Sequence, residues 1–145
     1  QTIMNHGPNI SHDGTKQHGF EPYVNNGGTT LAIPGKDFVI AAGDTRLSTG
    51  YSIHTRKASK LCQLTDKCVI VTAGMQSDAS TLHKTMKARL VTYEHQHGKP
   101  MSTEAIGQML SGMLYGRRFF PYYTFNLVAG LDSEGRGIVY GYDAI

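Results

Sequence analysis

Residues 25–46 read NNGGTTLAIPGKDFVIAAGDTR, and this stretch decides the fold. Two runs rich in apolar and β-branched residues, 29–33 and 38–43, flank a turn at 34–37. Proline presets φ in such a turn and glycine takes the conformation that other residues avoid, so the stretch predicts a β-hairpin. The second run is apolar throughout rather than alternating, which predicts a strand covered on both faces.

Charged residues follow the second run directly, in the order Asp44, Thr45 and Arg46. A charge at the end of a buried strand is costly unless it is paired, so we expect Asp44 and Arg46 to have defined partners. The same hairpin begins with a Gly28-Thr29 junction. A threonine becomes a peptidase nucleophile when a cut exposes its own α-amino group, which then acts as the base, so Thr29 is a candidate nucleophile.

With these residues in place, the sequence resembles the beta subunits of the proteasome, which belong to the N-terminal-nucleophile hydrolases. In active members the exposed threonine lies sixteen residues before the aspartate of an Asp-Ser/Thr-Arg motif, and the same count back from Asp44 reaches Gly28. Lys60 falls where the family has its active-site lysine, and Gly74 where it has the oxyanion-hole glycine. The resemblance therefore implies no catalytic residue and no cofactor: Gly28 stands at the nucleophile position, and Asp44, Lys60 and Gly74 are vestigial supports.

The resemblance covers about residues 20–143 and is carried by residues 26–56, by LYGRRFFPYY at 114–123 and by AGLD at 129–132. It implies an α+β fold, the four-layer αββα sandwich of the N-terminal-nucleophile hydrolases, in which two sheets lie between helix pairs. We expect a flexible N-terminal arm or leader at 1–19 and the proteasome beta-subunit domain at 20–145. Family members continue past this point with further helices and strands, so we interpret the domain as incomplete at its C-terminal end.

The resemblance also implies a structural role, as a non-catalytic beta subunit of the 20S core particle. Its partners would be the other alpha and beta subunits in stacked seven-membered rings, with regulatory particles acting indirectly, in ATP- and ubiquitin-dependent degradation in the cytoplasm and nucleus. One alternative is a catalytic threonine endopeptidase subunit that uses Thr29 after cleavage between Gly28 and Thr29. That alternative needs a slip of one residue, which turns each strand side chain to the opposite face. The other alternative is a free-standing binding domain.

Further elements follow in order along the chain. Runs at 61–64 and 69–74 predict a second hairpin, and runs at 124–131 and 137–142 predict a last strand pair. Between them, apolar residues spaced three or four apart predict two amphipathic helices that lie as an antiparallel layer on the sheet, the second capped by Ser102. The predicted apolar faces are Leu82, Met86, Leu90 and Tyr93 in the first helix and Ile106, Met109, Leu110, Met113 and Leu114 in the second.

The densest aromatic and cationic cluster lies between the second helix and the last strand pair. Arginine beside large aromatic residues is typical of a protein–protein interface, but the same residues could form core inside the chain, with arginine stacked on the rings. Both interpretations stay open. The candidate interface residues are Arg117, Arg118, Phe119, Phe120, Tyr122 and Tyr123.

Composition sets the remaining limits. The chain has 145 residues, enough for one domain, and a net charge of +3 that is too small and scattered to predict a nucleic-acid partner. No apolar run approaches the roughly 20 residues of a membrane span, and no signal-peptide pattern predicts secretion. Cys62 and Cys68 are expected to be reduced thiols, and we expect His6, His12 and His18 to belong to a solvated tail rather than a metal site.

Overall fold

The computed structural model describes residues 9–10, 16–17 and 19–145. Within the predicted N-terminal arm, β1 (Asn9–Ile10) pairs with β2 (Lys16–Gln17) in an antiparallel ladder. The rest of residues 1–18, including the three histidines at 6, 12 and 18, lies outside the described residues. The flexibility of the arm and the role of its histidines therefore stay predictions.

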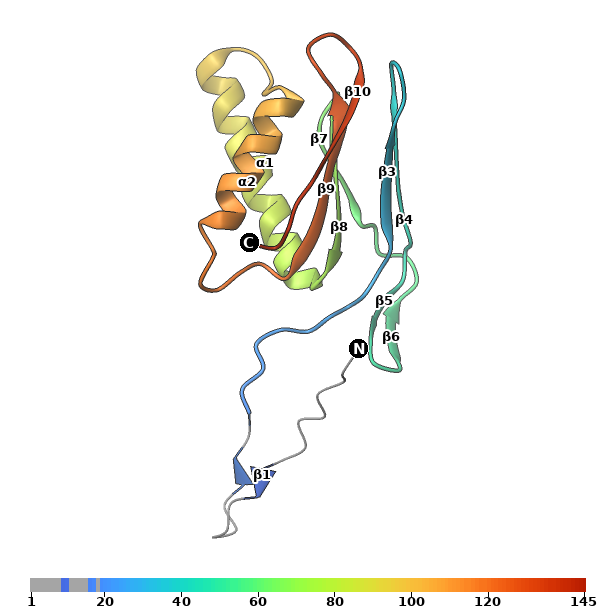
Figure 1. Ribbon diagram of the computed structural model, residues 1–145, viewed down its shortest axis with the longest axis vertical. Helices are drawn as coiled ribbons and strands as arrows, with labels where there is room; N and C mark the ends of the chain where they lie inside the picture. The colour runs from blue at the N-terminus through green and yellow to red at the C-terminus, as the bar shows by residue number, and fades with distance from the viewer. Residues whose placement is uncertain (1–8, 11–15, 18) are drawn as a thin grey trace.

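Three layers make up the described part of the domain (Figure 1). α1 (Gln76–His97) and α2 (Thr103–Tyr115) cover one face of a four-stranded antiparallel sheet with the strand order β10-β9-β8-β7. The β3–β4 hairpin packs on the opposite face. This order of layers confirms the predicted α+β class, and the second helix layer is not among the described residues. The strands from β3 onward are β3 (Thr30–Pro34), β4 (Val39–Gly43), β5 (Leu47–Thr49), β6 (Ser52–Thr55), β7 (Leu61–Thr65), β8 (Cys68–Gly74), β9 (Thr124–Leu131) and β10 (Gly137–Gly141).

The β3–β4 hairpin forms as predicted, but it is covered on one face only. Ile33 pairs with Ile40 across the strands, and the Gly35 N–H donates to the Phe38 carbonyl (2.7 Å) to close the turn. On the outer face Ile33 and Ile40 are 58% and 54% exposed. The prediction of cover on both faces is wrong for the described residues, because the sheet packs on the inner face of the hairpin and leaves the outer face open.

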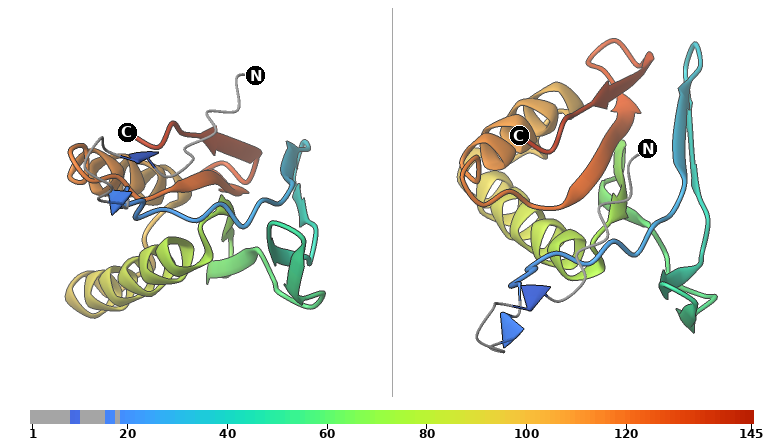
Figure 2. Two further views of the ribbon diagram at one scale, coloured as in Figure 1. Left: turned by 90° about the horizontal axis from the view of Figure 1, so that it is seen from below. Right: turned by 60° about the horizontal axis from the view of Figure 1, so that its bottom comes forward.

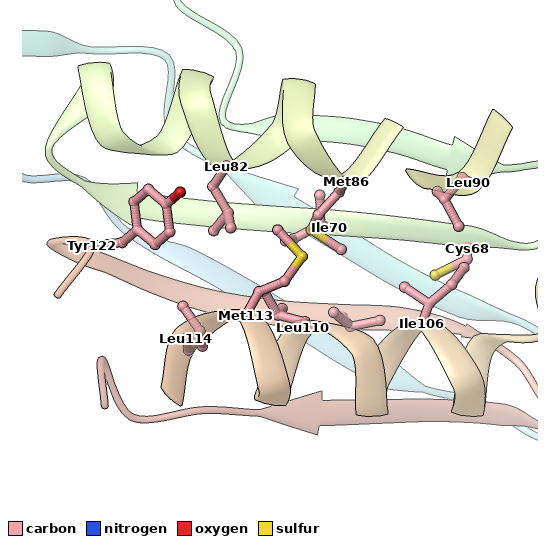
Figure 3. Packing of buried hydrophobic residues seen from close by; sticks show 11 residues of the cluster. Cys68, Ile70, Leu82, Met86, Leu90, Ile106, Leu110, Met113, Leu114 and Tyr122 are labelled. Atoms are coloured by element: carbon pink, nitrogen blue, oxygen red, sulfur yellow. The ribbon is translucent and has the colours of Figure 1, made fainter. Parts of the chain in front are cut away.

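The hydrophobic core lies between the helices and the sheet (Figure 3). Alternate residues of β8 point into it, among them Cys68 and Ile70, and they meet side chains from both helices. Cys62 and Cys68 are free thiols, as predicted, and burial raises the pKa of the Cys68 thiol to about 11. The buried helical residues repeat with the predicted helical period: Leu82, Met86, Leu90, Ile106, Leu110, Met113 and Leu114.

Both predicted helices are present with the expected ends. The Ala105 N–H donates to Ser102 Oγ (3.2 Å), which confirms the predicted cap of α2. Tyr93 is only half-buried and instead stacks on His97, with ring centroids 4.0 Å apart. In the part of the chain that is described, neither helix combines the length and the apolarity needed to cross a membrane.

A chain of buried polar side chains joins α1 to the sheet. The Thr72 hydroxyl of β8 donates to Asn126 Oδ1 (2.9 Å), and Asn126 Nδ2 donates to Thr124 Oγ1 (3.0 Å). Because the Thr72 hydroxyl already donates its proton, it accepts from His83 Nε2 of α1 (2.8 Å). Burial, with the positive charge of Lys87 beside it, lowers the pKa of His83, so the neutral ring with its proton on Nε2 fits this network.

His83 is expected to make folding stability fall as the pH drops below its ordinary pKa of 6.5. Because the pKa of His83 is lowered in the folded state, the unfolded chain binds the proton more readily. The contribution of His83 to stability is therefore fully present above the unfolded pKa and is lost as the pH falls toward the folded pKa. Lys60, Lys84 and Lys87 line the same small cavity as His83, and the positive charge of Lys87 opposes protonation of the His83 ring. His83→Gln keeps an N–H donor without titrating, so denaturant unfolding from about pH 7 to pH 5 should show a flatter profile for this variant. The exposed control, His95→Gln, should follow the unaltered protein, and an unchanged profile for His83→Gln would contradict the prediction.

Candidate functional site

Lys60 is the centre of the candidate site. It lies just before β7, and its side chain is only 5% exposed. Its ammonium donates to the backbone carbonyls of Asp44 (3.0 Å) and Arg46 (2.7 Å) and pairs with Asp44 Oδ1 (3.1 Å). An ammonium has three N–H donors, and the chain supplies three oxygens, so the buried charge is compensated where it lies.

Asp44 ties the end of β4 to the start of β3. Its Oδ1 accepts from the Thr29 N–H (2.8 Å), and its Oδ2 accepts from the Arg46 N–H (3.3 Å). The hydrogen bond from Thr29, with the contribution of Lys60, lowers the pKa of Asp44, so the carboxylate stays ionised. Asp44 therefore has the partner that its position predicts. Arg46 contributes backbone groups only: its side chain is exposed and forms no ion pair within residues 19–145, so a partner for its charge was wrongly predicted.

Gly28 lies two residues before β3 and faces Lys60. A Cβ placed on Gly28 would collide with Lys60 Cε and would lie 3.2 Å from Lys60 Nζ, so this position points directly at the lysine. The backbone of Gly28 has a φ of +109°, a conformation that favours glycine. Thr29 is exposed, and the Lys60 ammonium bonds to Asp44 and Arg46 rather than to the Thr29 hydroxyl.

Gly74 closes the site at the end of β8. Its N–H donates to the Gly27 carbonyl (3.3 Å), and its own carbonyl accepts from the Asn26 N–H (3.2 Å). Its φ is +114°, and a Cβ at this position would lie 2.5 Å from the Tyr123 carbonyl oxygen. Both the conformation and the close approach of the backbone therefore require glycine.

The structure places the four predicted site residues in one region. Gly28, Asp44 and Lys60 are neighbours, and Gly74 joins them through its hydrogen bond to the residue before Gly28. Acyl transfer through a covalent intermediate needs a hydroxyl, thiol or similar nucleophile beside the base. The position that faces the lysine carries only a hydrogen atom, so the arrangement orders the hairpin and offers no nucleophile at this point.

Comparison with known proteins assigns a family. The family model described as "Proteasome subunit" matches residues 24–145. The chain belongs to the proteasome subunit family. This result agrees with the family that the motif around Asp44 indicates.

Three relatives of this proteasome-family chain have the same name, proteasome subunit beta type-1. The relative from Dictyostelium discoideum is 59% identical over 130 residues, which is 88% of this chain and 55% of the relative. The relative from Danio rerio is 53% identical over 132 residues, 91% of this chain and 56% of the relative. The relative from Petunia hybrida is 52% identical over 130 residues, 90% of this chain and 58% of the relative. The chain thus spans little more than half the length of the curated relatives it matches.

Part of the aromatic cluster in this proteasome-family chain is internal. Tyr122 is buried in the core, and the Arg117 guanidinium lies 4.9 Å from the centroid of its ring. Tyr123 packs against Tyr23, with ring centroids 5.5 Å apart. For these residues the structure favours the interpretation as intrachain packing.

The other part of the cluster is on the surface. Phe119 is 93% exposed and Phe120 is 58% exposed. The Arg118 guanidinium lies 5.4 Å from the centroid of the Phe119 ring, so a cation and an aromatic side chain form one exposed patch. Exposed aromatic residues next to arginine match the composition of interface centres, and these three residues remain interface candidates.

No sequence pattern points to Asn26, although its contacts reach far along the chain. It lies in an Asn-Asn-Gly-Gly run, which is typical of a turn. Its side chain nevertheless bonds to Ser48, 22 residues away, and to Gln76, 50 residues away. Pairs so far apart leave no periodic signal in a single sequence.

Proposed function

We propose that this chain is a non-catalytic structural beta subunit of the 20S proteasome core particle, at the type-1 (sixth) beta position. It helps to enclose the chamber for ATP- and ubiquitin-dependent protein degradation, in the cytoplasm and nucleus. Its partners are the other alpha and beta subunits in stacked seven-membered rings, with regulatory particles acting through them. The names of its relatives support the type of subunit, since all three are called proteasome subunit beta type-1.

The observation that carries the non-catalytic role is the position of Gly28. Gly28 stands where the family resemblance places the nucleophile, and its missing Cβ points at the buried ammonium of Lys60. Without a hydroxyl or thiol there, no acyl intermediate forms beside the lysine. The remaining polar groups are engaged with one another: Asp44 holds both the Thr29 N–H and Lys60, so they stabilise the hairpin.

The alternative nucleophile, Thr29, has no such support. The Thr29 N–H is an amide that donates to Asp44, and a threonine nucleophile of this class would need a cut that turns this amide into a free α-amino group. Its exposed side chain forms no hydrogen bond with Lys60, whose donors all go to Asp44 and Arg46. Within residues 19–145 no observation favours a second function.

Exposed aromatic residues support the proposed place in a larger particle. Phe119 and Phe120 present large apolar surface beside Arg118, which suits burial against a neighbouring subunit. The outer face of β3–β4, with Ile33 and Ile40, is a second apolar surface of this kind. Co-elution of the native protein with related subunits in a very large particle is expected on sizing, and a free monomer would contradict the proposal.

Replacing Thr29 with alanine is expected to leave peptide hydrolysis by the assembled particle unchanged to within about twofold. The substitution keeps the backbone N–H that bonds to Asp44, so folding and assembly should also be preserved. A peptide vinyl sulfone, which reacts with threonine nucleophiles, should label other subunits of the particle and leave this chain unlabelled. Mass analysis that finds the chain starting at Thr29 and modified there would overturn the non-catalytic role, as would loss of one peptidase activity in Thr29→Ala.

A further inference from the structure

Residues 23–28 form a segment that we call the strap, because it runs from the N-terminal arm to the start of β3. Figure 1 shows it passing below the ends of β8 and β9, and Figure 2 shows the same course from two other directions. We infer that Asn26 locks the strap onto the Lys60 site, so that the chain's own backbone occupies the hydrogen-bonding groups of Gly74. This inference rests on the proposed non-catalytic function, since it concerns an uncut chain.

The strap takes the backbone groups through which an extended peptide would reach this end of β8. The Asn26 N–H donates to the Gly74 carbonyl (3.2 Å), and the Gly74 N–H donates to the Gly27 carbonyl (3.3 Å). A second strand or peptide pairs with a sheet through such free N–H and C=O groups. With both groups of Gly74 engaged inside the chain, this end of β8 offers no pairing site to another molecule.

The Asn26 side chain fixes the strap to two further elements. Its Oδ1 accepts from the backbone N–H of Gln76 (2.9 Å), and Gln76 is the first residue of α1. The residue at the helix N-cap, Met75, makes no side-chain cap bond, so Asn26 supplies a cap from 50 residues away. Its Nδ2 donates to the Ser48 carbonyl (3.1 Å) and to Thr49 Oγ1 (3.2 Å) of β5.

The other end of the strap is held by Tyr23. Its hydroxyl donates to the Pro121 carbonyl (2.7 Å), and its ring stacks on Phe120 with centroids 5.6 Å apart. Between the two anchors Val24 is 42% exposed, so apolar burial holds the middle of the strap only weakly. The position of the strap over Gly74 therefore depends on Asn26.

An asparagine is required because its side chain both accepts and donates. Aspartate could still accept from the Gln76 N–H, but it has no N–H for the Ser48 carbonyl or for Thr49 Oγ1. Alanine removes the cap and both donor bonds together. Asn25 provides a matched control, because its Oδ1 accepts from the Gly27 N–H (2.8 Å) inside the strap and its side chain bonds to no other element within residues 19–145.

Residue-resolved hydrogen exchange on the full chain, in its native assembled state, tests the inference. Asn26→Ala should raise the exchange rates of the Gly74 and Gln76 amides about tenfold, in line with the loss of a cap and its linked bonds. The Thr29 amide, which bonds to Asp44, should keep its rate. Asn25→Ala should leave Gly74 and Gln76 close to the unaltered protein.

Asn26→Asp keeps the test informative where Asn26→Ala does not assemble. In this variant the Gln76 amide should stay protected, while a non-specific protease should cut within residues 23–28 several times faster than in the unaltered protein. Unchanged exchange at Gly74 and Gln76 in Asn26→Ala, or unchanged cutting in Asn26→Asp, would overturn the role of Asn26. Neither result bears on catalysis, which is tested separately by labelling at Thr29.

Discussion

Replacing Gly74 with alanine is expected to lower the free energy of unfolding by about 4 kcal/mol, as the sum of two effects. The first is backbone strain, because a residue with a Cβ at a φ of +114° costs about 1–3 kcal/mol. The second is a collision: the new Cβ would lie 2.5 Å from the Tyr123 carbonyl oxygen and 3.4 Å from Thr124 Cα. These are backbone atoms that cannot rotate aside, so β8 and β9 must separate. Such overpacking costs roughly a further 1–3 kcal/mol.

Gly98→Ala is the matched control for this prediction. Gly98 has a φ of +70° at the end of α1, but a Cβ there would meet nothing within 4 Å. Its replacement should therefore cost only about 1 kcal/mol, the conformational part alone. Denaturant unfolding of the two variants gives the difference that is due to the close approach of β9. Equal losses at the two positions would show that Gly74 is required for its φ and not for space.

Most of the fold could be predicted because its signals are local. Pro34 and Gly35 mark the turn of the first hairpin, and a period of 3.6 residues marks the two helices. The cover of β4 could not be predicted in the same way. An apolar run shows that a strand tolerates burial on both faces, but which segments lie on those faces depends on contacts far along the chain, and Ile40 is 54% exposed.

The site was predictable only through the spacing of a family motif. Neither composition nor periodicity separates Lys60 from the other lysines, or Gly74 from the other glycines. Neither kind of signal marks Asn26 or His83, since both act through side-chain hydrogen bonds to residues that are not their neighbours in the sequence. Asn26 and Gln76 are 50 residues apart. His83 bonds to Thr72, which in turn bonds to Asn126, 54 residues further along the chain. Such contacts are fixed by packing, which a single sequence does not display.

Replacing Lys60 with methionine is expected to lower the free energy of unfolding by about 3 kcal/mol. Methionine keeps most of the buried side-chain volume, so the loss isolates the three charged contacts rather than a cavity. The carbonyls of Asp44 and Arg46 lose their donor, and unsatisfied acceptors of this kind cost about 1–3 kcal/mol each where water does not reach them. The Asp44 side chain is 41% exposed, so water replaces part of the interaction that its carboxylate loses with Lys60. The total loss of stability therefore stays near the lower end of the range for broken buried ion pairs.

The acid dependence of Lys60→Met provides a second measurement of the same contact. The pKa of Asp44 is lowered in the folded state, so its contribution to stability is present above its unfolded pKa of 3.8 and is lost as the pH falls through the folded value. In Lys60→Met this acid slope should shrink but persist, because the Thr29 N–H, the larger cause of the shift, still bonds to Asp44. Lys57→Met, an exposed neighbour, should change stability by less than about 0.5 kcal/mol and keep the full slope. If Lys60→Met behaved like Lys57→Met, the buried ammonium would have no part in holding the two strands, and the hairpin would owe its position to packing alone.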